Sequence, residues 1–430
     1  MKLNYKRTIL VGFAFFLISA FWQAYDAIVP LILTNLYGQG QDISGVIMSF
    51  DNILAVFMLP LFGNLSDKLR TPFGKRTPFI LFGTVSAVIF FVSFGLIRDA
   101  AFLPLFIVLL LLTLISMATF RSPAVALMPD VTVKPLRSKG NAIINLMGTA
   151  GGLIILLLGK IFNTGAAGKT DFLAYIIAVS AVMLTGLAVF LITVREKKWA
   201  EEMEAESEAL GLNAPEVDEP VGEKRSLSRG ELRSLMLILA SVALWYIGYN
   251  AITSKYSVYA TNVLGFDYNM TLMIANIAAI IAYIPVGIIA SKIGRKKSIL
   301  SGIVMLTTAF VIGIFLVYSP NVYFTYPVFA LAGIGWATIN VNSFPMVVEL
   351  AKGGDVGKYT GYYYTASMSA QIVTPILSGF LVERVFGWGI FFPYAAFFAA
   401  ASFVTMFFVK HGDSRPVKQS ALESLGEDND

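Results

Sequence analysis

Twelve long apolar stretches do most to limit what this chain can fold into. Each is long enough to cross the hydrocarbon core of a bilayer, which takes about 20 residues in a helix. The stretches lie near residues 8–36, 44–66, 77–97, 102–129, 140–163, 172–194, 233–263, 270–291, 298–318, 323–350, 359–383 and 388–409. Apolar residues make up 57% of the chain and charged residues only 14%, whereas soluble chains carry roughly a quarter charged residues. The sequence therefore predicts an all-α membrane protein with twelve transmembrane helices.

The lysine and arginine residues predict how these helices are oriented. If both termini are cytoplasmic, all but six of the 32 lysines and arginines lie on the cytoplasmic side. The six are Arg98, Lys169 and Arg384 in outer loops, Lys160 at an outer helix end, and Arg121 and Lys255 within helices. Such a bias is the positive-inside signal. It predicts a multi-pass protein of the plasma (inner) membrane with cytoplasmic termini, and it accounts for the net charge of +5 without a nucleic acid partner.

Residue types that are missing exclude several kinds of chemistry. The chain has no cysteine, which excludes disulfides and thiolate–metal sites, and its single histidine, His411, lies on the C-terminal tail. The loops between the apolar stretches are short, and none has the glycine-rich Walker pattern that binds ATP. We therefore expect no enzymatic activity, no cofactor and no metal site.

A polar segment divides the chain into two parts of similar length. We assign residues 1–194 to an N-terminal six-helix bundle, 195–232 to a cytoplasmic linker, 233–409 to a C-terminal six-helix bundle and 410–430 to a cytoplasmic tail. Within the linker, Trp199–Leu210 has good helix propensity. We expect the glutamates of the linker to form a solvated charge run that has no partner.

Two glycine-rich, basic loops recur about half the chain apart. The first basic loop runs from Gly63 to Arg76 and the second from Gly287 to Lys297. A turn of this kind at the same place in each half indicates an internal duplication, and duplicated halves are how membrane carriers build two bundles that rock about a central site. We expect the first loop to control this rocking through Gly63, Asp67, Arg70, Gly74, Lys75 and Arg76.

This layout resembles the major facilitator superfamily, whose loop pattern is Gly-x-Leu-(Ala/Ser)-Asp-Arg-x-Gly-Arg-(Arg/Lys). In the first loop Gly63, Asp67 and the basic residues match this pattern. In the second loop Gly294 and Arg295 match, but Ser291 stands where the acidic residue belongs. The resemblance covers the whole chain and implies two pseudo-symmetric six-helix halves that transport a small molecule by alternating access.

A narrower resemblance rests on residues 70–80 and 121–130. These segments are similar to the sucrose/proton symporters and to the glycoside–pentoside–hexuronide cation symporters, which implies a sugar as the substrate. The chain departs from the sodium-coupled members of the second group, because Ala55 and Leu59 stand where those have two aspartates. It also departs from the plant sucrose carriers, because Leu114 and Val125 replace their aspartate and arginine on helix 4.

Four charged residues stand out away from the ends of the apolar stretches, namely Asp26, Asp51, Arg121 and Lys255. A charge at the bilayer centre costs roughly 2.5–3.5 kcal/mol on insertion scales, so each needs a reason to be there. An aspartate that loses and regains an arginine partner as the bundles rock would take up a proton on one side and release it on the other. We predict that Asp26, Asp51 and Arg121 couple transport to protons.

Each of these four residues also has another interpretation. Asp26 could accept bonds from substrate hydroxyls or form a structural ion pair, and Asp51 could brace helix 2. Arg121 could bind substrate or be structural. Lys255 lies near the outer end of helix 7, where we expect its side chain to reach the lipid–water interface.

Polar and aromatic side chains at helical spacing predict a binding face on several helices. Amides bond sugar hydroxyls, and an aromatic ring packs against the apolar face of a pyranose. The predicted substrate-binding residues are Trp22, Gln23, Arg121, Tyr246, Tyr249, Asn250, Trp336, Asn340 and Gln371. The amides could instead bond neighbouring helices to one another. On helix 5, the stripe that includes Asn145, Gly148, Thr149 and Gly152 is most simply a close packing face.

These features lead to one functional hypothesis. We predict a proton-coupled secondary active transporter that imports a sugar or glycoside, with the substrate, the proton and the lipid bilayer as its partners. An exporter or uniporter of another small polar solute is the alternative within the same class. A non-transporting sensor built on a transporter fold is the alternative from a different class.

Overall fold

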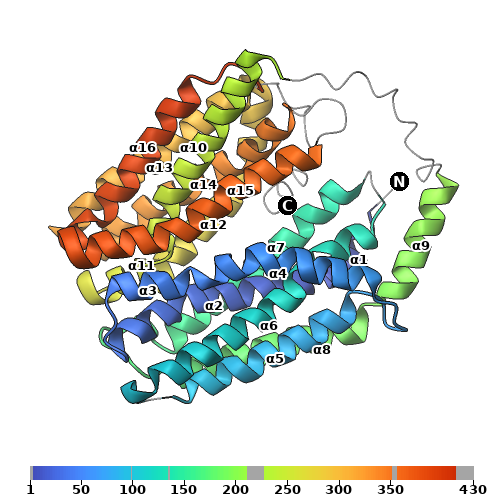
Figure 1. The fold of residues 1–430 in the computed structure, drawn as a ribbon, viewed down its shortest axis with the longest axis horizontal. Coiled ribbons are helices and arrows are strands. Elements are labelled where there is room, and N and C mark those ends of the chain that lie inside the picture. The colour runs from blue at the N-terminus through green and yellow to red at the C-terminus, as the bar shows by residue number, and fades with distance from the viewer. Residues whose placement is uncertain (1–2, 98, 134–135, 211–226, 351–355, 413–430) are drawn as a thin grey trace.

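The computed structural model describes residues 3–97, 99–133, 136–210, 227–350 and 356–412, and these residues form helices joined by short loops (Figure 1). The helices of the N-terminal half are α1 (Tyr5–Val11), α2 (Phe13–Asn35), α3 (Gln41–Met48), α4 (Phe50–Lys68), α5 (Thr77–Gly95), α6 (Leu103–Asp130), α7 (Arg137–Ile161) and α8 (Leu173–Thr193), with the short 3₁₀ helix η1 (Ala100–Phe102) before α6. The linker begins with α9 (Glu196–Ala209).

The C-terminal half follows the linker. It consists of α10 (Arg229–Thr253), α11 (Tyr256–Val258), η3 (Tyr259–Val263), α12 (Tyr268–Ile293), α13 (Arg295–Gly313), η4 (Ile314–Val317), α14 (Val322–Val348), α15 (Val356–Phe380), η5 (Leu381–Phe386), η6 (Gly387–Ile390) and α16 (Phe391–Phe407). Side-chain caps mark several starts, since Ser228 and Glu231 form a capping box at α10 and Asp267 caps α12.

The helices are long enough to cross a bilayer where the hydropathy predicts. Ten continuous helical stretches in the described ranges meet the length and apolarity of a membrane span, and the longest, Lys358–Phe407, contains both α15 and α16. The apolar helix Tyr268–Tyr283 within α12 is shorter. With α15 and α16 separated and α12 included, the helices correspond to the twelve predicted segments, which confirms the predicted all-α fold.

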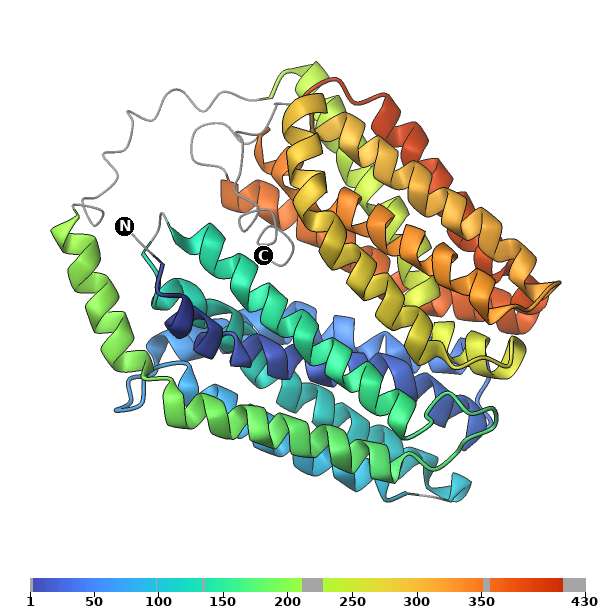
Figure 2. The same cartoon turned by 180° about the vertical axis from the view of Figure 1, so that it is seen from behind.

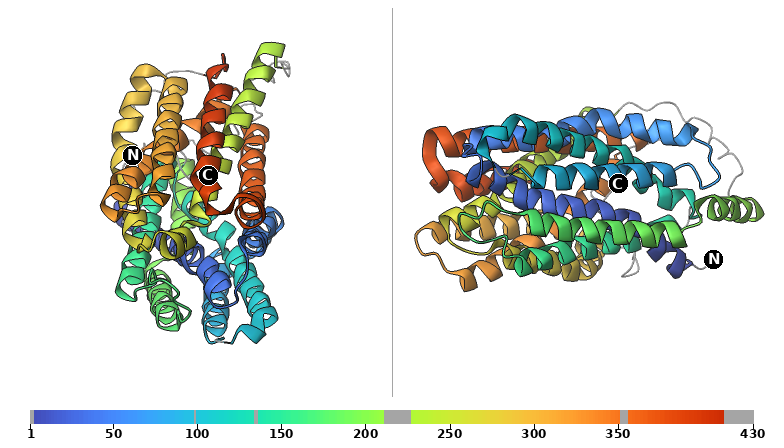
Figure 3. Two further views of the ribbon diagram at one scale, coloured as in Figure 1. Left: turned by 90° about the vertical axis from the view of Figure 1, so that its left-hand side faces the viewer. Right: turned by 90° about the horizontal axis from the view of Figure 1, so that it is seen from below.

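The two halves repeat one packing pattern. In the N-terminal half, α2 packs on α7 and α8, and α5 packs on α6 and α8, while α4 packs on α6. In the C-terminal half, α10 packs on α15 and α16, and α13 packs on α14 and α16, while α12 packs on α14. Each pairing in one half therefore has its counterpart in the other, as an internal duplication requires. Figures 2 and 3 show the two groups of helices side by side.

The halves meet at one end of the molecule and diverge toward the other (Figure 1). We call the end with α9 and the first basic loop the linker side, and the end with α3 and α11 the far side. Contacts between the halves join α3 to α15, α7 to α12, and α2 to α11. The first two of these pairings are equivalent under the twofold repeat.

A cluster of polar contacts joins the halves at the far side. The backbone N–H of Gln41 donates to Glu383 at 2.8 Å, and the Gln41 carbonyl accepts from Lys255 Nζ at 3.1 Å. Arg384 pairs with Asp42 at 2.7 Å. The expectation for Lys255 was therefore wrong, because its side chain is only 1% exposed and is held by the opposite half rather than reaching the interface.

The contact between α7 and α12, which is equivalent to that between α3 and α15, is also polar. The amide of Asn269 donates to Thr164 Oγ1 at 3.0 Å, and Lys160 Nζ lies 3.6 Å from Asp267. Together with the cluster around Gln41, these bonds close the far side in this structure.

Glycine makes the closest backbone approach across the halves possible. A Cβ atom on Gly45 of α3 would collide with the carbonyl of Pro375 on α15, and one on Gly379 would collide with the carbonyl of Gln41. The helices can therefore approach this closely only because these positions lack a side chain.

We predict that Gly45→Ala opens the far side, because the added methyl group forces α3 and α15 apart. The chain has no cysteine, so spin labels can be placed at Leu96→Cys and Tyr318→Cys alone. These exposed positions directly follow α5 and η4 at the far side, and their mean separation should increase. Gly361→Ala is the matched control on α15, because no atom lies within 4 Å of its Cβ position. Equal separations in both variants would refute the prediction.

Candidate functional site

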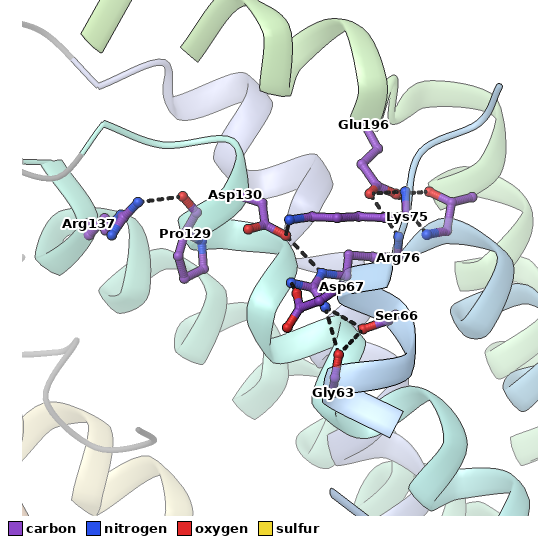
Figure 4. Close-up of polar contacts among 10 residues, drawn as sticks. Gly63, Ser66, Asp67, Lys75, Arg76, Pro129, Asp130, Arg137 and Glu196 are labelled. Atoms are coloured by element: carbon purple, nitrogen blue, oxygen red, sulfur yellow. Dashed lines mark hydrogen bonds and ion pairs between the residues drawn. The ribbon is translucent and has the colours of Figure 1, made fainter. Parts of the chain in front are cut away.

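Arg76, the last residue of the first basic loop, lies at the centre of a cluster of polar contacts (Figure 4). Its guanidinium pairs with Asp67 and donates to Ser66 on α4, and its Nε donates to Asp130 of α6 at 2.8 Å. The Nζ atom of Lys75 lies 3.2 Å from the same Asp130 carboxylate. The Arg76 side chain is buried, whereas the Asp67 side chain is 57% exposed, so water screens the Asp67 pair more than the bond to Asp130. Together these charged bonds tie the ends of α4, α5 and α6 to one another.

The other residues of this loop shape its turn. Gly74 has φ +115°, a conformation that side chains rarely allow, and its carbonyl accepts a bond from Thr71 Oγ1. The Gly63 carbonyl lies 3.4 Å from Arg76 Nη1. Arg70 is exposed and lies outside this cluster. The sequence thus predicted a group of charged residues in this loop. It did not predict that Arg76 also bonds Ser66 and Asp130.

The second basic loop keeps part of the same arrangement. Arg295 is 9% exposed, and its Nε lies 2.7 Å from Glu349 at the end of α14. Glu349 thereby corresponds to Asp130 at the end of α6. The loss of the acidic residue at Ser291 therefore leaves the arginine–carboxylate contact of the second loop in place.

A central cavity lies between the two halves in two adjoining parts. The larger part measures about 550 Å³ and the smaller about 440 Å³, and both are lined by Asn52, Arg121 and Gln371. The larger part is also lined by Tyr246, Asn340, Phe344, Tyr363 and Tyr364. The smaller part is also lined by Trp22, Gln23, Asp26, Asp51, Asn145, Thr149, Asn276 and Trp336. The far-side contacts close the cavity at one end, so its access is from the linker side.

In the part of the chain that the structure describes, the charged groups of this cavity lining all come from the N-terminal half. Asp26 lies in the middle of α2, yet its side chain is exposed to the cavity. Asp51 accepts a bond from Asn52 Nδ2 at 2.8 Å. The guanidinium carbon of Arg121 lies 5.5 Å from the centre of the Trp22 ring, a cation–π arrangement. The structure therefore brings the three predicted coupling residues into one cavity.

The C-terminal half supplies mainly rings and amides. The rings of Tyr249 and Trp336 stack with centroids 5.7 Å apart and planes inclined by 22°. Gln371 of α15 lines both parts of the cavity, and Asn340 of α14 lines the larger part. One face of the cavity is thus charged and the other is aromatic and neutral.

Tyr249 and Asn250 depart from the predicted arrangement. Tyr249 lines a small pocket of about 50 Å³ within the C-terminal half, next to Trp336. Asn250 lines neither part of the central cavity. The other predicted binding residues, Trp22, Gln23, Arg121, Tyr246, Trp336, Asn340 and Gln371, all line it.

Helix α7 has a second role that its sequence pattern did not reveal. The Cβ position of Gly148 is 2.7 Å from Ser19 Oγ, and that of Gly152 is 3.6 Å from Gln23, so the stripe is a close packing face as predicted. Its polar members Asn145 and Thr149 also line the cavity. Asn52 and Asn276 line the cavity too. Asn52 directly follows Asp51, and Asn276 stands alone in an apolar run, so their polarity and, for Asn52, the neighbouring aspartate were the signals that could have marked them.

The described ranges hold no cluster of metal-binding side chains. No three His, Asp or Glu side chains in these ranges gather closely enough to hold a metal ion.

Similarity to solved structures supports this architecture. The inward-open structure of the xylose transporter XylE from E. coli aligns with a TM-score of 0.71 at 12% identity, covering 98% of this chain and 99% of that one. A variant of the nucleoside transporter NupG aligns with a TM-score of 0.65 at 14% identity, covering 93% of this chain and 98% of that one. A variant of the peptide transporter POT aligns with a TM-score of 0.68 at 12% identity, covering 94% of this chain and 93% of that one. At such identities the likeness shows the fold alone.

No curated protein matches this chain by sequence. The family model of the Major Facilitator Superfamily, however, matches residues 11–342 and 270–426, which together span nearly the whole chain. The match covers both of the duplicated halves and the charged loop between α4 and α5. The chain therefore belongs to the major facilitator superfamily.

Proposed function

We propose that this protein imports a sugar or a glycoside together with a proton by alternating access. The charge balance of the central cavity is the observation that carries the proposal. Among the residues that the structure describes, the smaller part of the cavity is lined by two carboxylates, Asp26 and Asp51, but by only one cationic group, Arg121. One carboxylate is thus left without a cationic counterpart at the centre of a membrane protein, where unbalanced charge is costly.

A proton would remove this imbalance. When one carboxylate is protonated, the other can pair with Arg121, and the cavity becomes neutral with a neutral substrate inside it. The Asp26 side chain is exposed to the cavity, which favours it as the group that exchanges the proton. In this structure the cavity is reached from the linker side, which the distribution of lysine and arginine assigns to the cytoplasm. We therefore interpret this conformation as the one that releases substrate and proton into the cell.

The opposite face of the cavity favours a sugar. Tyr246, Trp336 and the rings beside them offer flat surfaces to the apolar face of a pyranose, while Asn340 and Gln371 can bond its hydroxyls. This mixture would also suit a nucleoside, which joins a sugar to a flat base. The similarity in fold to both sugar and nucleoside transporters does not separate the two substrates.

The charge balance predicts which ion drives uptake. In proteoliposomes screened with a panel of mono- and disaccharides and nucleosides, addition of the transported solute should make the outside medium more alkaline. Replacing sodium with choline should change nothing, because Ala55 and Leu59 provide no carboxylates for a sodium site. One charge moved through about 150 mV is worth roughly 3.5 kcal/mol, enough for a solute gradient of a few hundred-fold. Strict sodium dependence without a pH change would overturn the proton assignment.

We expect Asp26→Asn to abolish uphill accumulation while solute exchange continues. The amide keeps the size of the side chain and its ability to accept a hydrogen bond, but it cannot carry the proton. Uptake driven by a pH gradient, compared with exchange at equal pH in the same vesicles, separates these two activities. A variant that still concentrates solute would transfer the proposed role to Asp51, for which Asp51→Asn is the corresponding test.

Arg121→Ala should reduce uptake by about tenfold or more, because it removes the one cationic group found in the cavity lining within the described ranges. Arg121→Lys should restore it only in part, since an ammonium group is a point charge and cannot reproduce the planar, forked guanidinium that lies beside the Trp22 ring. The initial rate of uptake under a fixed pH gradient measures both variants. Normal uptake by Arg121→Ala would show that this arginine is only tolerated.

A further inference from the structure

The first residue of the linker helix is bonded to the first basic loop (Figure 4). One carboxylate, that of Glu196, accepts hydrogen bonds from the backbone N–H groups of Lys75, Arg76 and Thr77 at 2.7, 2.8 and 2.7 Å. It also accepts from Thr77 Oγ1 at 2.7 Å. Glu196 is only 2% exposed. The linker therefore does not start as the solvated charge run that its composition predicts.

These four bonds meet a need that the loop cannot meet itself. The first N–H groups of a helix have no partner within it, and helix α5 begins at Thr77. The usual capping position is occupied by Arg76, whose side chain makes no capping bond and extends instead to α4 and α6. A carboxylate at a helix N-terminus is stabilised both by these bonds and by the helix dipole. Glu196 thus caps α5 from a distant part of the chain.

The shape of the loop accommodates this carboxylate. A Cβ atom on Gly74 would collide with the Glu196 carboxylate, so a glycine is required there for space as well as for its positive φ. A second contact holds the same linker helix, since Arg7 of α1 pairs with Glu202 and lies over the ring of Trp199 at 4.9 Å. The two contacts attach α9 to the N-terminal half at separate points.

We propose that Glu196 is a positioning residue for Arg76, so that the linker holds the charged loop in the geometry on which the rocking of the two halves depends. Glu196 holds the backbone N–H groups of Arg76 and of the residues before and after it. In this way it directs the arginine side chain toward Asp67 and Asp130. The inference goes beyond the proposed substrate and ion, because it rests only on rocking between the halves.

The first test reports on the order of the loop and needs no substrate. A spin label at Phe73→Cys, a position that is 73% exposed at the tip of the loop, should become more mobile when Glu196→Ala is added. Glu202→Ala is the matched control on the same helix, because it breaks the Arg7 contact and leaves the loop alone. Thr77→Ala removes one of the four bonds and should give a smaller increase. Unchanged mobility in Glu196→Ala would overturn the proposal.

The second test asks whether Glu196 acts through Arg76. Labels at Leu96→Cys and Tyr318→Cys report the ratio of far-side-open to far-side-closed molecules. Glu196→Ala should change this ratio about fivefold in the same direction as Arg76→Ala, which corresponds to about 1 kcal/mol. The double variant should change it no further than Arg76→Ala alone. If the two single changes multiply in the double variant, the glutamate acts independently of the arginine and the proposal fails. It also fails if Glu196→Ala leaves the ratio of far-side-open to far-side-closed molecules unchanged.

Failure of these tests is distinct from failure of the proposed function. Neither measurement uses a sugar or a pH gradient, so a wrong substrate or ion would leave both results unchanged. Glu196→Gln keeps the side-chain volume but replaces one acceptor oxygen with an amide donor, which would face the N–H groups of the loop. In both measurements Glu196→Gln should give values between those of the original chain and Glu196→Ala. It also replaces the alanine variant in these tests if that variant fails to fold.

Discussion

The cost of placing charge in a lipid bilayer is the constraint on which this structure depends. It makes the spanning segments apolar, sends most lysines and arginines to one side, and leaves only a few charged residues inside. Three of these, Asp26, Asp51 and Arg121, line the water-accessible cavity between the halves. The fourth, Lys255, bonds the opposite half at the far side. Each intramembrane charge is thus accounted for by a cavity or by a partner.

The two ends of the molecule are held in different ways. At the far side, bonds such as those of Gln41 with Glu383 and Lys255 cross between the halves, and these must break before that side can open. At the linker side, the bonds of Arg76 and Glu196 stay within the N-terminal half and make its helix ends one unit. Breakable contacts between rigid units are what alternating access requires, because a cavity can then change sides while the packing within each half persists.

The cavity itself combines two kinds of recognition. The N-terminal face carries the charges, and the C-terminal face carries rings and amides such as Trp336 and Gln371. A substrate held between them would touch both halves, so its binding would be sensitive to their relative position. Arg121 lies on Trp22, where a change in the protonation of either aspartate alters the charge balance of the whole site. The proposed coupling of a neutral solute to a proton rests on this division.

The sequence alone determined the number and order of the helices, the duplication and the location of the first basic loop, because the bilayer and the loop pattern act on residues close together in the chain. It also marked Asp26 and Arg121 as candidate site residues, since a charge in an apolar run is conspicuous. Only the tertiary structure decided the partners of Lys255 and Glu196, the cavity role of Asn145, and the position of Asn250 outside the cavity. Gln41 lies 214 residues from Lys255 and Arg76 lies 120 residues from Glu196, so these bonds depend on how separate helices pack, which no local pattern specifies.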